Sequence, residues 1–498
     1  MILIISLFLV ISLIGSAYLV TFRGYTISDL LVLALFLFPL LFLGRFSVAF
    51  KIKFLGHWYL GFELCAAVLL VFFLLVKLLS SASGKMRMFY LVFLLTSLLL
   101  VGLASGLING TSLIDFGAAI QASFRWFIPF LLACVAISTL PKTPESNARL
   151  VDSYILVYGI ITPLLILVSA LFTRQLAGLM GWDPYAVSEA AGAGFTRGWT
   201  PTGSGMTSGI LVLFAYSMAL ARLIRKHRTV FNAFVTALCV VSILFTLARS
   251  VMISLVFFHI LAFRVTLWRN LSRVLISFLL ILILVAPAMI FLSSRYGFER
   301  FFLLGGESVQ IRWYSALAGL KLGSEKPLLG QGPAQLYWDV RQPRMMSGTI
   351  KEKVITIRNL PSAKEPHNLY ILTFAETGLI GLTLLVAALL FWLHRLNTVR
   401  KYALYVPEYL LETNAHWSML IAFAFYHLTD SGIFLYPKVA LTMWLSLLVG
   451  LHSAATVENQ VWASAQYDDL ARDNDYEIDQ VGYSEIPDSQ YVEGAYYS

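Results

Sequence analysis

The segment 365–370 (EPHNLY) places an ionisable histidine beside an amide side chain, directly before a long apolar run. Pro366 favours a helix that begins here, so His367 is expected at the water edge of that helix. The positive end of the helix dipole favours a bound anion and disfavours a charged imidazole. A neutral His367 can accept a proton from an attacking hydroxyl, and Asn368 can cap the helix or orient a ligand. The alternative is that His367 is only a capping or interfacial residue.

A second candidate lies in the segment 311–320 (IRWYSALAGL), which predicts a helix. Arg312 and Gly319 share one small, polar face of this helix, and the single guanidinium on that face suits a closely approaching phosphate. The surrounding polar segment 293–366 holds eleven Lys and Arg residues against six Asp and Glu. Such an excess in an outward loop indicates an anionic ligand. In 326–333 (KPLLGQGP) a turn is favoured over an anion-binding loop.

Arg249 lies between two apolar segments, where a charge marks a functional site unless it reaches interfacial water. Further polar residues within apolar segments or near their ends are weaker candidates for ligand contact: Arg125, Glu63, Arg197 and Asp430. The alternatives for them are interfacial or solvated side chains.

The elements that must hold these residues are apolar helices. Hydrophobic residues make up 59% of the 498 residues and charged residues 13%, which predicts an all-α, polytopic membrane protein with about 12–13 transmembrane helices. The spans are expected near 1–20, 27–44, 57–79, 88–108, 115–140, 151–172, 207–224, 230–247, 250–264, 274–292, 368–393, 412–434 and 437–455.

The chain is expected to divide into four parts: transmembrane helices with short loops at 1–292, a large extracytoplasmic loop at 293–366, C-terminal transmembrane helices at 367–455, and a cytoplasmic tail at 456–498. Short basic loops after residues 221, 263 and 394 indicate the cytoplasmic side, so the candidate residues face the extracytoplasmic side. The tail carries ten acidic residues against Arg472 alone and is expected to be disordered. Its tyrosines suggest a kinase or another cytoplasmic partner, the alternative being a solubilising end.

Several segments together resemble the O-antigen ligase and O-antigen polymerase superfamily of membrane glycosyltransferases. They are 247–250 (LARS), 312–317 (RWYSAL), 326–332 (KPLLGQG), 367–370 (HNLY) and 376–381 (ETGLIG), and their order and spacing carry the resemblance across about residues 200–395. One departure is Ala248, where the family often has Ser.

The resemblance implies a fold of the GT-C type and an inverting glycosyltransferase that needs no metal or other cofactor. Its members transfer a glycan from undecaprenyl diphosphate to an acceptor hydroxyl. Arg249 and Arg312 match arginines that the family uses on the diphosphate, His367 matches its essential histidine, and Asp430 matches a C-terminal acidic residue. The implied partners are the lipid-linked donor, a glycan or lipid-linked acceptor and membrane lipid, with no nucleic acid. The implied setting is the inner cell membrane in the synthesis of O-antigen, capsule or exopolysaccharide.

Two other classes remain. A transporter or flippase of lipid-linked oligosaccharides would share the helices and cationic sites, but it would not require a large outer loop with a histidine at a helix mouth. A membrane scaffold leaves the basic excess of that loop unexplained. Within the enzyme class the size of the loop favours a polymerase over a ligase.

Overall fold

The computed structural model of the protein describes most of its apolar segments. The described backbone comprises residues 24–41, 52–54, 57–59, 61–79, 89–109, 113–172, 198, 200, 205–246, 248–262, 307–333, 366–403 and 407–478.

This part of the chain is helical apart from one antiparallel pair of three-residue strands, β1 (Ile52–Phe54) and β2 (His57–Tyr59). Its N-terminal half contains the helices α2 (Ile27–Leu41), α4 (Gly61–Leu79), α5 (Phe89–Asn109), α6 (Leu113–Ser138), α7 (Pro144–Tyr154), the π-helical η1 (Ile155–Ile161) and α8 (Thr162–Leu171). Its C-terminal half contains α11 (Gly205–Ile224), α12 (Thr229–Phe245), α13 (Arg249–Ala262), α17 (Glu307–Glu325), α19 (Leu369–Tyr402), α20 (Pro407–Tyr426), α21 (Gly432–Leu435) and α22 (Pro437–Ile478).

The helices confirm a polytopic, essentially all-α membrane protein. Within the described residues, six helical segments are long and apolar enough to cross a membrane: Tyr90–Asn109, Phe116–Ser138, Pro144–Leu171, Met206–Ile224, Leu369–Tyr402 and Pro437–Val461. Four shorter apolar helices accompany them, in α2, α4, α12 and α13. The span expected at 57–79 begins later, at Gly61, because 57–59 form β2. The spans expected at 1–20 and 274–292 lie outside the described residues.

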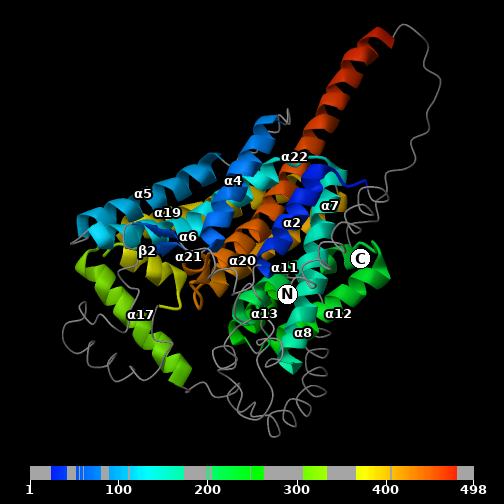
Figure 1. Ribbon diagram of the computed structural model, residues 1–498. Helices are drawn as coiled ribbons and strands as arrows, with labels where there is room; N and C mark the ends of the chain where they lie inside the picture. Colours follow the sequence, from blue (N-terminus) through cyan, green and yellow to red (C-terminus); the bar gives the residue numbers. More distant parts are fainter. Residues whose placement is uncertain are drawn as a thin grey trace.

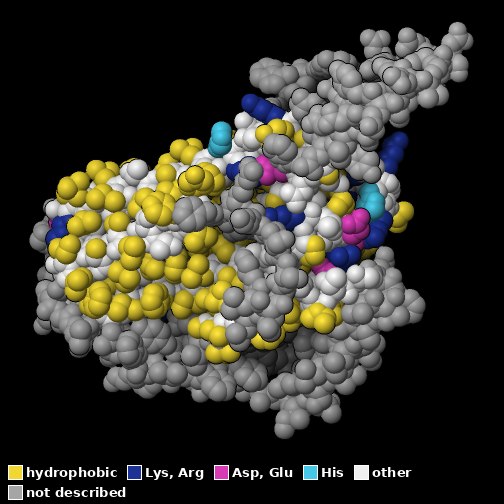
Figure 2. All heavy atoms as spheres, turned by 90° about the horizontal axis from the view of Figure 1, so that it is seen from above, with side chains coloured by type: hydrophobic (Ala, Val, Ile, Leu, Met, Phe, Trp, Pro, Cys, Tyr) yellow, Lys and Arg dark blue, Asp and Glu magenta, His cyan; other side chains and the backbone are white. Residues whose placement is uncertain are grey.

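The helices at the centre of the bundle are buried, and those at its outside expose apolar side chains. The spanning part of α22 is 94% buried and that of α11 is 83% buried, so these two helices form the centre of the bundle (Figure 1). In contrast, α4 and α5 expose large side chains such as Val68, Phe93 and Ile108. Figure 2 shows apolar side chains covering much of one face. A contiguous apolar surface of this kind is suited to lipid contact.

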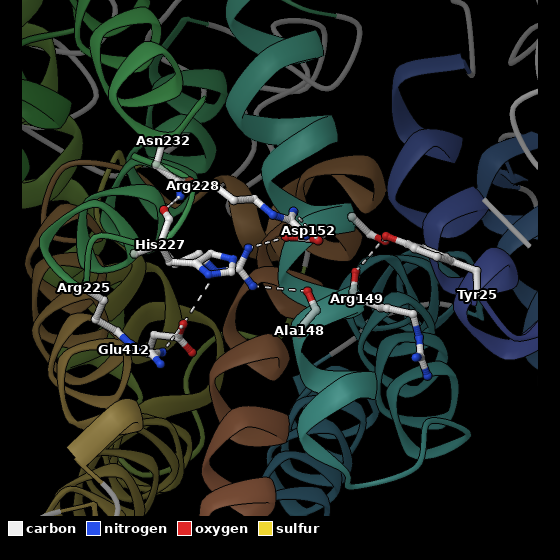
Figure 3. A network of polar contacts seen from close by, with 11 residues as sticks. Tyr25, Ala148, Arg149, Asp152, Arg225, His227, Arg228, Asn232 and Glu412 are labelled. Carbon is white, nitrogen blue, oxygen red and sulfur yellow. Dashed lines mark hydrogen bonds and ion pairs between the residues drawn. The ribbon is translucent and has the colours of Figure 1, made fainter. Parts of the chain in front are cut away.

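Charged side chains gather where α11 ends and α20 begins, a group that we call the ion network (Figure 3). Arg222 is ion-paired with both Asp152 and Glu412, and its side chain is almost fully buried. Arg225 lies 3.3 Å from Glu412. Arg228 lies 3.0 Å from Asp152 and completes the group. Three arginines therefore tie α7, α11 and α20 together at one end of the bundle.

The last helix continues beyond its span. The span is expected to end near residue 455, but α22 extends to Ile478, and its C-terminal part projects away from the other helices (Figure 1). Residues 479–498 lie outside the described part of the chain, as does most of the segment 293–366. The division into four parts therefore stays a prediction.

Candidate functional site

The helix mouth that carries His367 is built by Asn368. Asn368 is the N-cap of α19, where its Oδ1 accepts hydrogen bonds of 3.0 Å from the backbone N–H of Tyr370 and of Ile371. These are two of the donors that the first turn of a helix leaves unpaired. Helix α19 begins at Leu369, close to the start expected at 368, and His367 is half-buried just before it. The capping role of Asn368 is confirmed, and a contact with a ligand stays a prediction.

This helix mouth docks on the turn 427–431, which follows α20. The N–H of Leu369 donates to the carbonyl of His427 at 2.9 Å. The side-chain amide of Asn368 donates to the carbonyl of Leu428 at 3.0 Å. Ser431 donates its hydroxyl to the carbonyl of Pro366, also at 3.0 Å. Three hydrogen bonds thus join the residues on both sides of His367 to the turn that carries Asp430.

Asp430 is held in place by groups around its carboxylate. The hydroxyl of Tyr426 donates to Oδ2 at 2.5 Å, and the N–H of Gly432 donates to Oδ1 at 3.2 Å. Tyr426 is fully buried, and its hydroxyl is also hydrogen-bonded to the side chain of Thr207 at the start of α11. A half-buried carboxylate with charge-assisted hydrogen bonds is a fixed partner for a nearby cation.

Arg312 lies close enough to Asp430 for their charges to interact. Its guanidinium lies near the N-terminal end of α11, where one nitrogen is 3.4 Å from the sulfur of Met206. Burial lowers the pKa of Arg312 from its usual value and Arg249 acts in the same direction, whereas Asp430 raises it. An arginine stays protonated at neutral pH despite such a shift. We call Arg249, Arg312, Tyr426 and Asp430 together the arginine site.

The structure therefore brings together residues from three separate parts of the sequence. Arg249 begins α13, Arg312 comes from α17, Tyr426 ends α20, and Asp430 follows that helix. Among the described residues, Arg249 and Arg312 together carry more positive charge than the carboxylate of Asp430 offsets. Such a site can hold a diphosphate and stabilise negative charge that develops on it.

Helix α17 packs closely on α19 through small residues. A Cβ atom at Gly319 would lie 2.7 Å from the Cγ2 of Ile371 and 3.5 Å from Pro366. At Gly323 it would lie 2.4 Å from the ring of Phe374. The two residues expected on one polar face of this helix therefore have different neighbours. Gly319 contacts α19, whereas Arg312, two turns earlier, reaches the arginine site.

The segment 326–333 fills a break in α19. Gly378 has φ 68° and ψ −164°, which interrupts the helix. The N–H groups of Gln331 and Gly332 donate to the carbonyls of Ala375 and Glu376 at 2.8 and 2.9 Å. In return, the N–H of Leu379 donates to the carbonyl of Pro327 at 2.7 Å. The turn favoured from the sequence is therefore confirmed, because these amides pair with α19 and do not face an anion.

The same segment is fixed by α5 from the other side. Asn109 donates its amide to the carbonyl of Gly330 at 2.8 Å and accepts a hydrogen bond of 2.6 Å from Lys326. Ser105 reaches the carbonyls of both Gly330 and Glu376. Segment 326–333, the break at Gly378 and these α5 side chains form one unit, which we call the clasp. The clasp ties α17 to α19, and so holds Arg312 relative to the helix mouth.

Arg125 lies elsewhere. With Ser123, Glu376 and Thr377 it lines a cavity of about 20 Å³, large enough for about one water molecule. The lining of this cavity does not include Arg249, Arg312 or Asp430. Arg125 therefore belongs to a separate small cavity with a largely apolar lining, and its contact with a substrate stays a prediction.

Arg197 and the side chain of Glu63 lie outside the described residues. The residue after Arg197 is placed, since the N–H of Gly198 donates to the carbonyl of Phe245 at 3.0 Å. Phe245 ends α12, four positions before Arg249. Gly198 therefore lies beside the end of α12.

Sequence reasoning missed Tyr426 and Thr207. Tyr426 ends α20 and Thr207 lies in the first turn of α11. Both stand among apolar residues, where the sequence alone suggests that a lone hydroxyl side chain serves only in packing. One available signal is the short spacing from Tyr426 to Asp430, which places both at the end of one span.

The fold and the site together define a class of protein: a multi-pass membrane protein with a cationic site at one end of its helices. Residues 233–386 match a family model described as O-Antigen ligase. This match covers about a third of the chain and includes Arg249, Arg312, His367, the segment 326–333 and Gly378. No curated protein matches the chain.

The match confirms the resemblance to the O-antigen ligase and polymerase superfamily. For the matched region, the finding supports a membrane enzyme of the O-antigen ligase or polymerase type in glycan assembly.

Proposed function

We propose that the protein is an inverting, metal-independent glycosyltransferase that extends or transfers glycans carried on undecaprenyl diphosphate. The observation that supports this most directly is the pairing of Arg312 and Arg249 beside a fixed carboxylate, at the end of the bundle where the His367 helix mouth docks. Fixed cations can stabilise a diphosphate leaving group, which is the main electrostatic requirement of the reaction.

In the proposed reaction, an acceptor hydroxyl attacks the anomeric carbon of the donor. The new glycosidic C–O bond forms as the C–O bond to the diphosphate breaks, and a single displacement inverts the anomeric configuration. The bonding electrons leave with undecaprenyl diphosphate, whose added negative charge is stabilised by Arg249 and Arg312. The acceptor's proton passes to His367, which acts as a general base or orients the hydroxyl. Asp430 keeps the Arg312 guanidinium in position.

We further propose that the reaction takes place at the extracytoplasmic face of the inner cell membrane, in the synthesis of O-antigen, capsule or exopolysaccharide. Helix α20 has the ion network near its first residues and the arginine site at its last. Basic loops favour the cytoplasmic side, so the arginine site lies on the other. Polymerase is favoured over ligase because the polar segment 293–366 is large and nothing in the sequence marks a second lipid-anchored acceptor.

The test uses purified protein in lipid vesicles, with an undecaprenyl-diphosphate-linked oligosaccharide as the sole substrate. We expect free undecaprenyl diphosphate and longer glycans, the outcome for a polymerase. Release that begins only when a separate acceptor is added would identify a ligase. Movement of the intact lipid across the bilayer, with no diphosphate released in either condition, would contradict the proposal and identify a transporter.

A smaller prediction concerns Tyr426. In Tyr426→Phe the carboxylate of Asp430 loses its hydroxyl donor, so we expect kcat/KM to fall by about ten- to a hundredfold, as for other hydrogen bonds to charged groups. The matched control is Tyr370→Phe, which also removes one buried hydroxyl, in this case bonded to the carbonyl of Ala424 at 2.7 Å. Equal losses in the two variants would show that Tyr426 acts only through packing.

A further inference from the structure

The turn 427–431 contains a histidine to which the proposed reaction gives no role. His427 is 1% exposed, and its ring lies edge-on to Phe423 and Tyr426 at 4.3 and 5.2 Å between centroids. Its Nδ1 lies 2.8 Å from the carbonyl oxygen of Asp430. A carbonyl oxygen only accepts, so Nδ1 carries the proton and His427 donates this hydrogen bond. Its Nε2 is buried and has no hydrogen-bond partner within the described part of the chain.

The carbonyl that His427 holds belongs to the peptide unit between Asp430 and Ser431. The side chains on the two sides of this unit reach different parts of the site. Asp430 extends toward Tyr426 and the charge of Arg312. Ser431 donates to the carbonyl of Pro366, the residue before His367. The orientation of one peptide plane therefore sets the arginine site relative to the helix mouth.

We propose that His427 is a positioning residue, which fixes the Arg312–Asp430 pair relative to His367 through the 430–431 peptide unit. This inference rests on the proposed function, since it concerns the distance between the groups that bind the diphosphate and the group that receives the proton. Misplacing reacting groups by about 1 Å can lower a rate by about a hundredfold. Loss of the hydrogen bond should therefore lower kcat more than it raises KM.

Two substitutions separate this role from simple packing. In His427→Asn the amide nitrogen is attached one carbon beyond Cβ, as Nδ1 is, so the variant keeps a donor toward the carbonyl of Asp430. In His427→Gln the side chain fills more of the ring's volume, but its amide lies near the place of Nε2. Positioning predicts that the asparagine variant is the more active of the two, whereas packing against Phe423 predicts the reverse.

The experiment compares both variants in the vesicle transfer assay. We expect kcat of His427→Gln to be lower than that of His427→Asn by about tenfold or more, with KM values within about threefold. Matched controls are His416→Asn and His416→Gln, at a buried histidine of α20 beside Gly450. The asparagine variant should have no advantage there. A His427→Gln variant as active as His427→Asn would overturn the inference.

A second measurement does not depend on activity. Cryo-electron microscopy of the two His427 variants in lipid nanodiscs should show the contacts Tyr426–Asp430 and Ser431–Pro366 intact in the asparagine variant and displaced in the glutamine variant. Both contacts intact in both variants would overturn the inference. Absence of transfer by the unmodified protein would instead overturn the proposed function, and the nanodisc structures would still decide the role of His427.

Discussion

Arg312→Gln should lower kcat/KM for glycan transfer by about 100- to 1,000-fold, the effect of removing one fixed donor from a developing negative charge. Asp430 and Tyr426 would remain in place, but the carboxylate would lose its neighbouring cation and add repulsion to a bound diphosphate. The measurement is the initial rate of undecaprenyl diphosphate release in vesicles, at equal amounts of folded protein.

Two further variants separate the role of the Arg312 guanidinium from that of its charge alone. Lys321→Gln removes an exposed positive charge from the same helix, so it controls for the general electrostatic attraction of the donor. Arg312→Lys keeps the charge but loses the planar fork, and we expect it to recover only part of the rate. If Arg312→Gln retained activity within about twofold of the unmodified protein, the assignment of Arg312 to the diphosphate would be wrong.

The second large effect is expected at Gly378, where an alanine should prevent much of the protein from folding. The backbone there has φ 68° and ψ −164°, which residues other than glycine rarely adopt. A Cβ atom would also lie 2.2 Å from the carbonyl oxygen of Leu328. Strain and overpacking each amount to about 1–3 kcal/mol. Moving Leu328 away would also break the hydrogen bonds through which the clasp satisfies the interrupted helix.

Gly24→Ala is the matched control, because Gly24 also has a positive φ, 63°, but no atom of the described residues lies within 4 Å of its added Cβ. We expect Gly378→Ala to give a much smaller monodisperse fraction and a lower Tm in detergent than Gly24→Ala. Equal stability of the two variants would mean that Leu328 can move freely and that the clasp does not hold α19.

Hydropathy predicted the positions of the spans better than the ends of the helices. Helix α19 was expected to end near 393 and continues to Tyr402, and α22 continues to Ile478. Hydropathy reports where a segment meets lipid, whereas a helix ends only when its backbone loses its hydrogen-bonding pattern. Both helices continue past the apolar window into sequence that contains charged residues, which a window of apolar residues cannot detect.

The candidate site was predictable in its charged members but not in its supports. Arg249, Arg312 and Asp430 were selected because charges are expensive near hydrocarbon, and the structure brings these three together. Tyr426 has no such signal, since an aromatic residue at the end of a span is ordinary. The break at Gly378 was equally hidden, because the apolar sequence continues on both sides of it and a lone glycine does not identify its partner, the segment 326–333.

Helix α20 also fixes the distance between the two charged ends of the protein. From Glu412 in the ion network to Tyr426 beside Asp430, the helix rises by about 21 Å. The hydrocarbon layer of a typical bilayer is about 30 Å thick, and any tilt of the helix shortens its reach further. In the topology that we propose, the two charged groups are therefore closer together than the two headgroup layers of an undisturbed bilayer. The bilayer would become thinner around the protein, or water would enter at one end, and the length of the surrounding acyl chains would then affect how easily a diphosphate reaches Arg312.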